Sequence, residues 1–279
     1  MFIANAAARI WFGLQDIVIH QLGVVFIISW DTLLHLGNAI TFNRKRGFVI
    51  QAGLPGHGGL WPAFERPKAS DSRSCCPALN ALSGILPRDG RNITWDQLSR
   101  SIRGTYNFSP SFIVFTLNFM ADMLQKDSRV DTFDLSDLNV HNGIEHDASL
   151  TRHDVAHQPD QSKPAIDLID RLLASATGKD EDGKPMLTVA DVSRFAEERR
   201  EHSRKTNGQY TLDSTTLVTI YGGKVDDLKV ILKEERLPEG WEPRIRARNG
   251  LTMAKLNGIV LHLELGIAPL RGSRTVRAQ

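Results

Sequence analysis

The sequence predicts a mainly α-helical fold, because helix-start signals recur along the chain while strand signals are few. Each helix-start signal pairs a capping side chain with a proline or with an acidic or amide residue in the first turn. Apolar residues make up 41% of the 279 residues and charged residues 24%. This is ordinary globular usage with ample material for a core, and it excludes collagen-like, coiled-coil and low-complexity chains.

The first two helices of the body are expected near residues 95 and 110. Thr-Trp-Asp-Gln at 94–97 is a capping box, which predicts a short helix behind it. Ser109 then places a cap residue before Pro110, and proline is favoured at the first helical position. The run 112–124 that follows is apolar nearly all round, which is typical of a buried helix.

Three further helices are expected, at 164–173, at 188–205 and at 225–235. The first opens at a proline, the second carries Thr-Val-Ala-Asp as a capping signature, and the third ends shortly before a proline. Only two apolar runs predict strands, at 217–221 and at 259–265. The expected architecture is therefore a helical body with almost no sheet.

Residues 1–45 form a separate hydrophobic N-terminal segment, distinct from the body at 46–279. Apolar residues dominate 17–40, but Asp31 interrupts them, and a charge at the centre of a bilayer costs about 2.5–3.5 kcal/mol on insertion scales. The uninterrupted run 22–30 is shorter than the ~20 residues that span a bilayer. Three interpretations stay open: an imperfect membrane anchor, an uncleaved signal-like segment, and an amphipathic helix packed on the body.

Charge and cysteine content exclude several functions. Lys and Arg number 34 against 32 Asp and Glu, so the net charge is +2 and no basic field predicts a nucleic-acid partner. The chain holds only two cysteines, and they are neighbours, Cys75 and Cys76. Adjacent cysteines rarely bridge each other, which excludes a disulfide scaffold, and the absence of a Cys-x-x-Cys pair excludes a zinc ribbon.

Cys76 is the expected cap residue of a short helix, because Pro77 follows it. The free amides and the positive dipole end of such a helix stabilise a thiolate. A thiolate in this position suits three roles: a nucleophile, a redox thiol, or an axial ligand to haem iron. A buried structural cysteine is the plain alternative.

A second candidate site is the segment Glu145-His146-Asp147, with Ser149 close behind. Glu145 and Ser149 offer hard oxygen atoms four residues apart, which on a helix would share a face and suit Mg²⁺ better than zinc. His146 beside Asp147 could act as an oriented proton-transfer group. A solvated charged turn is the alternative. Three nearby histidines leave a transition-metal site open: His141, His153 and His157.

Three motifs taken together indicate a protein family far more specifically than any one of them alone. They are Cys-Pro-Ala-Leu-Asn-Ala-Leu at 76–82, Leu-Pro-Arg-Asp-Gly-Arg-Asn-Ile-Thr at 86–94, and Glu-His-Asp-x-Ser at 145–149 with Arg152 three residues beyond. On these motifs the chain is identified as a member of the fungal haem-thiolate peroxidases, the family of chloroperoxidase and the short unspecific peroxygenases. The resemblance covers residues 57–267 and is similar to ascomycete members with a hydrophobic N-terminus, some of which act in secondary metabolism.

The resemblance implies a chloroperoxidase-like helical domain over 46–279, with haem b between a proximal helix that carries Cys76 and a set of distal helices. Cys76 would be the iron ligand, and Glu145, Ser149 and the carbonyl oxygen of His146 would hold Mg²⁺ or Mn²⁺. The His146 side chain, steadied by Asp147, would orient the acid–base carboxylate of the distal pocket. The implied reaction uses hydrogen peroxide to oxidise or oxygenate a small organic substrate, in a membrane-associated or secretory setting.

The sequence departs from the family at two positions that bear on this chemistry. Cys75 stands where a proline is common, so two thiols compete for one iron, and Cys76 is favoured because the motif follows it. The distal glutamate of the family aligns with Asp213, which has a shorter side chain and follows a shortened connection. Glu198 and Glu201 are the alternatives for the acid, although both also fit surface charges.

Three functional hypotheses follow. The first is an active haem-thiolate peroxidase or peroxygenase. The second is a haem-binding member of the family with impaired or lost peroxidase activity, because the segment before Asp213 is shortened. The third, from another class, is a membrane-associated partner-binding protein without haem.

Overall fold

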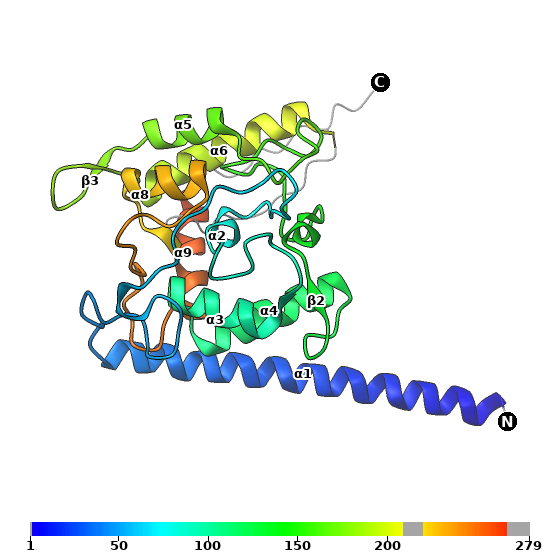
Figure 1. The fold of residues 1–279 in the computed structure, drawn as a ribbon. Helices are drawn as coiled ribbons and strands as arrows, with labels where there is room; N and C mark the ends of the chain where they lie inside the picture. The colour runs from blue at the N-terminus through cyan, green and yellow to red at the C-terminus, as the bar shows by residue number, and fades with distance from the viewer. Residues whose placement is uncertain (1, 209–219, 267–279) are drawn as a thin grey trace, which may run out of the picture. The chain divides into compact units, whose positions relative to one another are not determined.

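The computed structural model describes residues 2–208 and 220–266, and it is mainly helical as predicted (Figure 1). The chain divides into two compact units, each built from separated stretches of sequence. Unit 1 comprises Met1–Pro62, Ile93–Thr132 and Glu242–Leu256, and unit 2 comprises Ala63–Asn92, Phe133–Trp241 and Asn257–Gln279. The predicted boundary after residue 45 stays a prediction.

Unit 1 is built around three helices. They are α1 (Phe2–Ile40), α3 (Trp95–Tyr106) and α4 (Pro110–Leu124), with a 3-10 turn η1 (His57–Gly59) and the short strand β1 (Ile93–Thr94). The capping box that begins α3 is confirmed, since the Thr94 hydroxyl accepts from the Gln97 amide at 3.2 Å and the Gln97 side chain accepts from the Thr94 amide. Ser109 caps α4 in the same way, with Pro110 at the first helical position.

Helix α1 packs against α4, and the stripe that it turns inward over its last turns is polar. Asp31 is buried, and its carboxylate accepts hydrogen bonds from the amides of Met253 and Ala254 at 3.0 and 2.9 Å and from the Ser111 hydroxyl at 2.6 Å. One carboxylate of α1 therefore caps the first turn of α9 (Met253–Leu265) and binds α4 at the same time.

The inward stripe continues one and two turns further along α1. The His35 ring lies 3.1 Å from the Thr252 hydroxyl. Asn38 donates to the Gly250 carbonyl oxygen at 2.9 Å and accepts from the Asn249 amide at 2.8 Å. Among the described residues, Gln21–Ile40 is also long and apolar enough to cross a membrane, a test that a signal sequence passes as well.

Unit 2 contains the remaining short elements and the site discussed below. Its elements are α2 (Pro77–Asn80), η2 (Leu135–Asn139), α5 (Ile166–Ala174), α6 (Val189–Thr206), α8 (Val225–Lys229) and a π-helical turn, η3 (Val230–Glu234). The division of the sequence between the units falls within the strand β2 (Thr132–Phe133), and β3 (Gly178–Lys179) pairs antiparallel with β4 (Pro185–Met186). The predicted capping box of α6 is confirmed at Thr188 and Asp191.

The strand predicted at 259–265 is wrong, because these residues belong to α9. An apolar run with β-branched residues does not by itself distinguish a strand from a helix. Here Thr252 precedes the helix and its hydroxyl accepts from the Lys255 amide, and the carboxylate of Asp31 accepts from two further amides of the first turn, those of Met253 and Ala254. Of the other predicted strand, 217–219 lie outside the described residues, and Ile220 and Tyr221 are helical.

Replacing Asp31 with alanine should destabilise the protein, because two helix-start amides and the Ser111 hydroxyl lose a charged acceptor. We expect the free energy of unfolding to fall by about 2–3 kcal/mol. Urea denaturation followed by circular dichroism measures the change. Asp122→Ala is the matched control, since Asp122 is an exposed aspartate of α4. Equal stability of the two variants would contradict the capping role of Asp31.

Candidate functional site

Cys76 is the N-cap residue of α2, as predicted, with φ −90°, ψ 110° and Pro77 at the first helical position. In the part of the chain that the structure describes, the Cys76 side chain makes no capping hydrogen bond, and the Leu79 amide donates to the Cys76 carbonyl oxygen at 3.1 Å. Burial raises the pKa of the Cys76 thiol above its ordinary value, while the nearby amides of Leu79 and Ala78 act in the opposite direction. The sulfur thus lies half-buried at a helix start whose donors are suited to a thiolate once a cation faces it.

The neighbouring thiol is in a different environment. Cys75 is buried, and its sulfur lies 3.8 Å from the Leu138 carbonyl oxygen and 3.9 Å from the Ser74 hydroxyl. Burial raises the pKa of the Cys75 thiol to about 12, with the nearby Cys76 adding to the effect. A protonated thiol that donates to a carbonyl is stable there, so the two cysteines are chemically distinct.

Two asparagines hold the backbone that leads into Cys76. Asn80, from the Cys-Pro-Ala-Leu-Asn motif, accepts from the Ser74 amide at 2.9 Å and donates to the Ser74 carbonyl oxygen at 2.7 Å. Asn139 accepts from the Cys75 amide at 2.5 Å and donates to the Arg73 carbonyl oxygen at 3.0 Å. The position of the Cys76 sulfur is therefore set by side chains on both sides of the loop.

A buried carboxylate, Glu235, joins this loop to the Glu-His-Asp segment. It accepts from Arg152 at 2.5 Å, from Arg73 at 2.5 Å and from the Asn80 side chain at 3.0 Å. Arg152 is itself fully buried, and it also donates to the Thr151 and Gln161 carbonyl oxygens. Glu235 has a positive φ of 51° at the end of η3, which non-glycine residues adopt only where the surroundings fix them.

The Glu-His-Asp segment is a turn, so the helical face proposed for Glu145 and Ser149 is not formed. Ala148 has φ 56°, which breaks the segment between the two residues. Glu145 is buried, and its Oε2 accepts from the His141 ring at 2.5 Å. Its other oxygen, Oε1, has no hydrogen-bond partner among the described residues. The Ser149 hydroxyl accepts from the Thr151 amide at 3.3 Å.

His146 lies half-buried in the same turn. Its Nδ1 is 2.8 Å from the carbonyl oxygen of Asp147, and because a carbonyl only accepts, this bond requires a proton on Nδ1. The neutral ring then presents Nε2 as an acceptor. The Asp147 carboxylate is buried and lies 3.9 Å from Nε2 of His141. Asp147 thus orients His146 through its main chain.

A second buried carboxylate, Asp154, binds the segment to α6. It accepts from the Ala148 amide at 3.0 Å, from Ser203 at 2.9 Å and from Arg199 at 3.1 Å. Burial alone would raise the pKa of Asp154, but the hydrogen bonds from Ser203, Ala148 and Asn207 outweigh it, so the pKa lies below its ordinary value. Asp154 therefore stays ionised and holds the left-handed residue Ala148 in place.

The candidate distal acids differ in what the structure describes. Asp213 lies outside the described residues. Glu198 pairs with Arg171 and Glu201 pairs with Lys205 at 2.6 Å, and both glutamates are more than half exposed. These pairings are those of surface charges.

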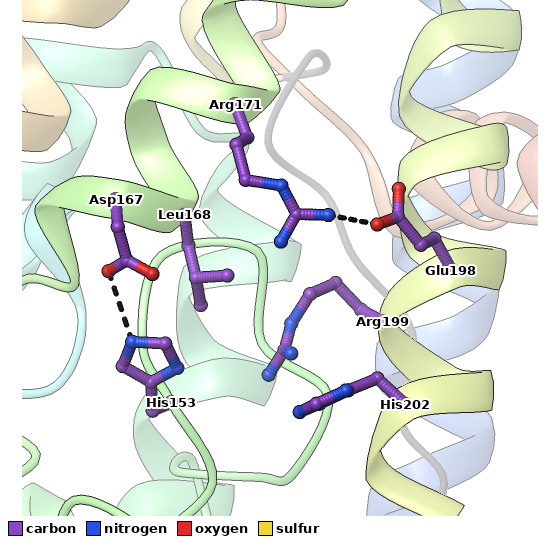
Figure 2. A pocket seen from close by; sticks show the side chains of 7 residues that line it. All are labelled: His153, Asp167, Leu168, Arg171, Glu198, Arg199 and His202. Atoms are coloured by element: carbon purple, nitrogen blue, oxygen red, sulfur yellow. Dashed lines mark hydrogen bonds and ion pairs between the residues drawn. The ribbon is translucent and has the colours of Figure 1, made fainter.

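Glu198 also borders a cavity of about 280 Å³ between α5 and α6 (Figure 2). Arg171 points toward Glu198, the His153 ring lies 3.0 Å from Asp167, and Arg199 and His202 project from α6 into the space between. Arg199 is already paired with Asp154. The charged groups of the cavity are therefore largely paired, either with one another or, for Arg199, with Asp154. The cavity is lined by His153, Asp167, Leu168, Arg171, Glu198, Arg199 and His202.

The nearby histidines do not gather into a metal site. His153 pairs with Asp167, and His157 lies 3.2 Å from the Thr206 hydroxyl. Among the side chains that the structure describes, no three His, Cys, Asp or Glu residues lie close enough to hold a metal ion by themselves. An ion at Glu145 would therefore need main-chain, hydroxyl or external ligands to complete its coordination.

Comparison with known proteins assigns the family. The model of the family described as "Peroxidase, family 2" matches residues 62–246, which is more than half of the chain. The chain belongs to this family. It is the fungal chloroperoxidase family of haem-thiolate peroxidases, and the membership predicted from the sequence motifs is confirmed. A search of curated proteins finds no significant match.

Two buried carboxylates that hold the motif segments in place, Glu235 and Asp154, were not predicted from the sequence. Glu235 and Asp154 lie in no motif of their own, and their partners are distant in the sequence. In the sequence, Arg199 and Arg200 stand in a charged run that is typical of a solvated helix face, but the structure buries both, and buried guanidinium groups require acidic partners. The two acids are Asp154 for Arg199 and Glu264 for Arg200.

Glu235→Ala should strongly destabilise unit 2, because the substitution leaves the fully buried Arg152 without its carboxylate partner. Breaking a buried charge pair by removing one partner costs about 3–5 kcal/mol. Glu235→Gln keeps a hydrogen-bond acceptor and should lose less. Glu234→Ala is the control, since this neighbour is exposed and pairs only with Arg236 in the described part of the chain. Thermal and urea unfolding of the three variants measure the order, and an equal loss for Glu234→Ala would contradict it.

Proposed function

We propose that this protein is a haem-thiolate peroxidase that uses hydrogen peroxide to oxidise or oxygenate a small organic molecule. Membership of peroxidase family 2 supports a peroxidase function, and the haem, the substrate and the choice between peroxidase and peroxygenase belong to the proposal. The observation that carries it is the position of Cys76 as the N-cap residue of α2, where the amides of Leu79 and Ala78 act to lower the pKa of its thiol. The adjacent Cys75 differs, because burial raises the pKa of its thiol to about 12.

The residues around Cys76 fit a haem iron. Thiolate ligands to iron are stabilised by amide donors near the sulfur, and the amides of Leu79 and Ala78 at the start of α2 act to lower the pKa of the Cys76 thiol. Iron would also supply the positive charge that a buried thiolate needs. When bound, haem b would supply redox-active iron, on which thiolate ligation favours cleavage of the O–O bond. The hydrogen bonds of Asn80 and Asn139 to the backbone of Ser74 and Cys75 hold the loop before Cys76, and so fix the position of its sulfur for that ligation.

Glu145 supports a bound cation beside this site. Its Oε1 is buried without a hydrogen-bond partner in the part of the chain that the structure describes, and an unpaired buried carboxylate oxygen is unfavourable. A hard cation such as Mg²⁺ or Mn²⁺ would satisfy it, since both ions prefer oxygen ligands. We propose the Ser149 hydroxyl and the His146 carbonyl oxygen as further ligands, following the family motif.

Proton transfer is assigned to His146 and a distal carboxylate. The Nδ1 proton of His146 is engaged by the Asp147 carbonyl oxygen, which leaves Nε2 as an acceptor that can hold and orient a carboxylic acid. We propose Asp213 as that acid, because it occupies the aligned position. Its role is to take a proton from peroxide and return it to the leaving oxygen.

A second candidate function follows from the aspartate at position 213. Aspartate is one methylene shorter than the glutamate of the family, and a general acid must be within hydrogen-bond reach of its proton acceptor. A protein that binds haem but turns over peroxide poorly is therefore the alternative.

Cys76→Ser should abolish thiolate ligation, because a serine hydroxyl stays protonated at neutral pH and is a poor iron ligand. The reduced protein with carbon monoxide should show the red-shifted absorption band of thiolate-ligated haem in the wild type and lose it in the variant. Cys75→Ser is the matched control and should keep the band, since Cys75 donates to a carbonyl instead. The opposite pattern in the two variants would reverse the assignment, and no band in the wild type would remove the haem proposal.

Asp213→Asn should lower peroxide turnover by about 10²–10⁴-fold, the usual effect of losing a general acid–base group. The haem spectrum should be unchanged, because the iron ligand is Cys76. Asp213→Glu should raise peroxide turnover, because the longer side chain brings the carboxylate within hydrogen-bond reach of the peroxide. Glu201→Gln is the control, since this exposed glutamate pairs with Lys205 on the helix surface. Full turnover by Asp213→Asn would contradict the assignment, and negligible turnover by the wild type would favour the second candidate function.

A further inference from the structure

Large apolar side chains dominate the exposed positions of α1 between residues 21 and 40, where Gln21, Ser29 and Thr32 are exposed as well. Leu33 is 68% exposed and Phe26 66%, although both lie in a helix that packs against α4 (Figure 1). Six of the exposed apolar positions recur at helical spacing on one side of the helix, with the exposed Ser29 lying between Phe26 and Leu33. We call these six positions the apolar stripe. It consists of Leu22, Val25, Phe26, Leu33, Leu36 and Ile40.

This arrangement is the reverse of an ordinary surface helix. A helix on a water-soluble domain turns its apolar side inward and its polar side to solvent. Over its last turns α1 instead turns Asp31, His35 and Asn38 inward, and each is hydrogen-bonded within unit 1. Fully burying one large aliphatic or aromatic side chain stabilises by about 1.5–3 kcal/mol, and the apolar stripe forgoes this gain as long as it faces water.

A cluster of cations lies at the C-terminal end of the apolar stripe. Two separate chain segments form it, because the Arg44 amide donates to the Arg246 carbonyl oxygen at 2.8 Å and the Arg44 guanidinium donates to the Arg248 carbonyl oxygen at 3.0 Å. In the described part of the chain, Arg46, Arg246 and Arg248 form no ion pair. We call this set the basic cluster: Arg44, Lys45, Arg46, Arg244, Arg246 and Arg248.

Two exposed aromatic side chains flank the N-terminal part of the basic cluster, at residues 44–46. Phe42 is 95% exposed and Phe48 is 74% exposed, on either side of the three consecutive cations that follow α1. An acidic residue, Glu242, also lies beside the basic cluster, and its carboxylate accepts from the Gly47 amide at 2.6 Å. Exposed aromatic and aliphatic groups next to cations such as Arg46, Arg246 and Arg248 match a lipid interface, where the cations meet headgroups and the apolar groups enter the acyl region.

We propose that unit 1 binds the surface of an anionic lipid bilayer, with residues 21–40 of α1 lying in the plane of the interface. The apolar stripe would enter the acyl boundary and the basic cluster would contact anionic headgroups. An in-plane position keeps the hydrogen bonds of Asp31, His35 and Asn38, whereas a spanning helix would break them and expose Asp31 to hydrocarbon. A nucleic acid would match the cations but would leave the apolar stripe in water.

The headgroup contact is tested with full-length protein and vesicles of phosphatidylcholine, with or without phosphatidylserine. The wild type should bind the anionic vesicles more tightly, and added salt should weaken this binding. Reversing two cations in Arg46→Glu/Arg246→Glu should weaken it by about tenfold or more, since each cation near such a surface contributes about 1 kcal/mol. The control, Lys179→Glu/Lys229→Glu, makes the same charge change at exposed lysines of unit 2 and should bind like the wild type.

The apolar contact is tested with Leu33→Ser/Leu36→Ser, which should weaken binding to both kinds of vesicle. Val130→Ser is its control, because Val130 is an exposed apolar residue of unit 1 outside the apolar stripe. An epitope added at the N-terminus should stay accessible to antibody outside the vesicles. An epitope protected until detergent is added would show a spanning helix and overturn the in-plane arrangement.

The proposal is also overturned if the charge-reversed variant binds like the wild type, if neither kind of vesicle is bound, or if single-stranded RNA competes the protein off the anionic vesicles. None of these measurements depends on haem or on peroxide turnover. Their failure would leave the proposed peroxidase function standing, and failure of that function would leave this inference standing.

Discussion

Glu235 brings a negative charge into the interior of unit 2, and the surrounding structure is organised by the need to compensate it. An isolated buried carboxylate is unfavourable by several kcal/mol, so it must collect donors. Its donors are Arg73, Arg152 and Asn80, which come from the loop before Cys76, from the segment after Glu145 and from α2. Because Arg152 is fully buried as well, neither partner can leave without exposing the other to an uncompensated environment.

The same constraint recurs at two other buried acids. Asp154 collects donors from the Glu-His-Asp turn and from α6, and Asp31 collects amides from α9 and a hydroxyl from α4. In each case one carboxylate joins segments that lie far apart in the sequence. The short helices of this protein would contribute little stability alone, so these shared acceptors determine where the loops between them lie.

The parts of the structure that could be predicted from sequence are those encoded locally. The starts of α3, α4 and α6 depend on a cap and a residue three positions later, and the N-cap position of Cys76 depends on the following proline. The family could be predicted because its motifs are contiguous. By contrast, 259–265 was expected to be a strand because its helix start is completed by Asp31, 222 positions away from Met253.

The site shows the same division between local and distant information. The residues at 145–149 were singled out from the sequence as a family motif, and their role stays a prediction. The helical arrangement considered for them is not formed, because Ala148 adopts a left-handed conformation held by Asp154. Spacing along the sequence cannot reveal such a turn. Glu235 was missed for a related reason, since its identity as an acceptor depends on which arginines become buried.

The distance between Asp31 and its partners also bears on how the protein is made. Translation proceeds at about 5–20 residues per second, so α1 leaves the ribosome roughly 10–40 s before Met253 and Ala254 are synthesised. During that interval Asp31 has its partner Ser111 of α4 but lacks the amides of Met253 and Ala254. His35 and Asn38 likewise lack Thr252 and Gly250, their partners in the C-terminal segment. The nascent helix is then a substrate for any chaperone or targeting factor that recognises apolar sequence. A decision about the cellular destination of this chain would therefore precede the completion of its fold.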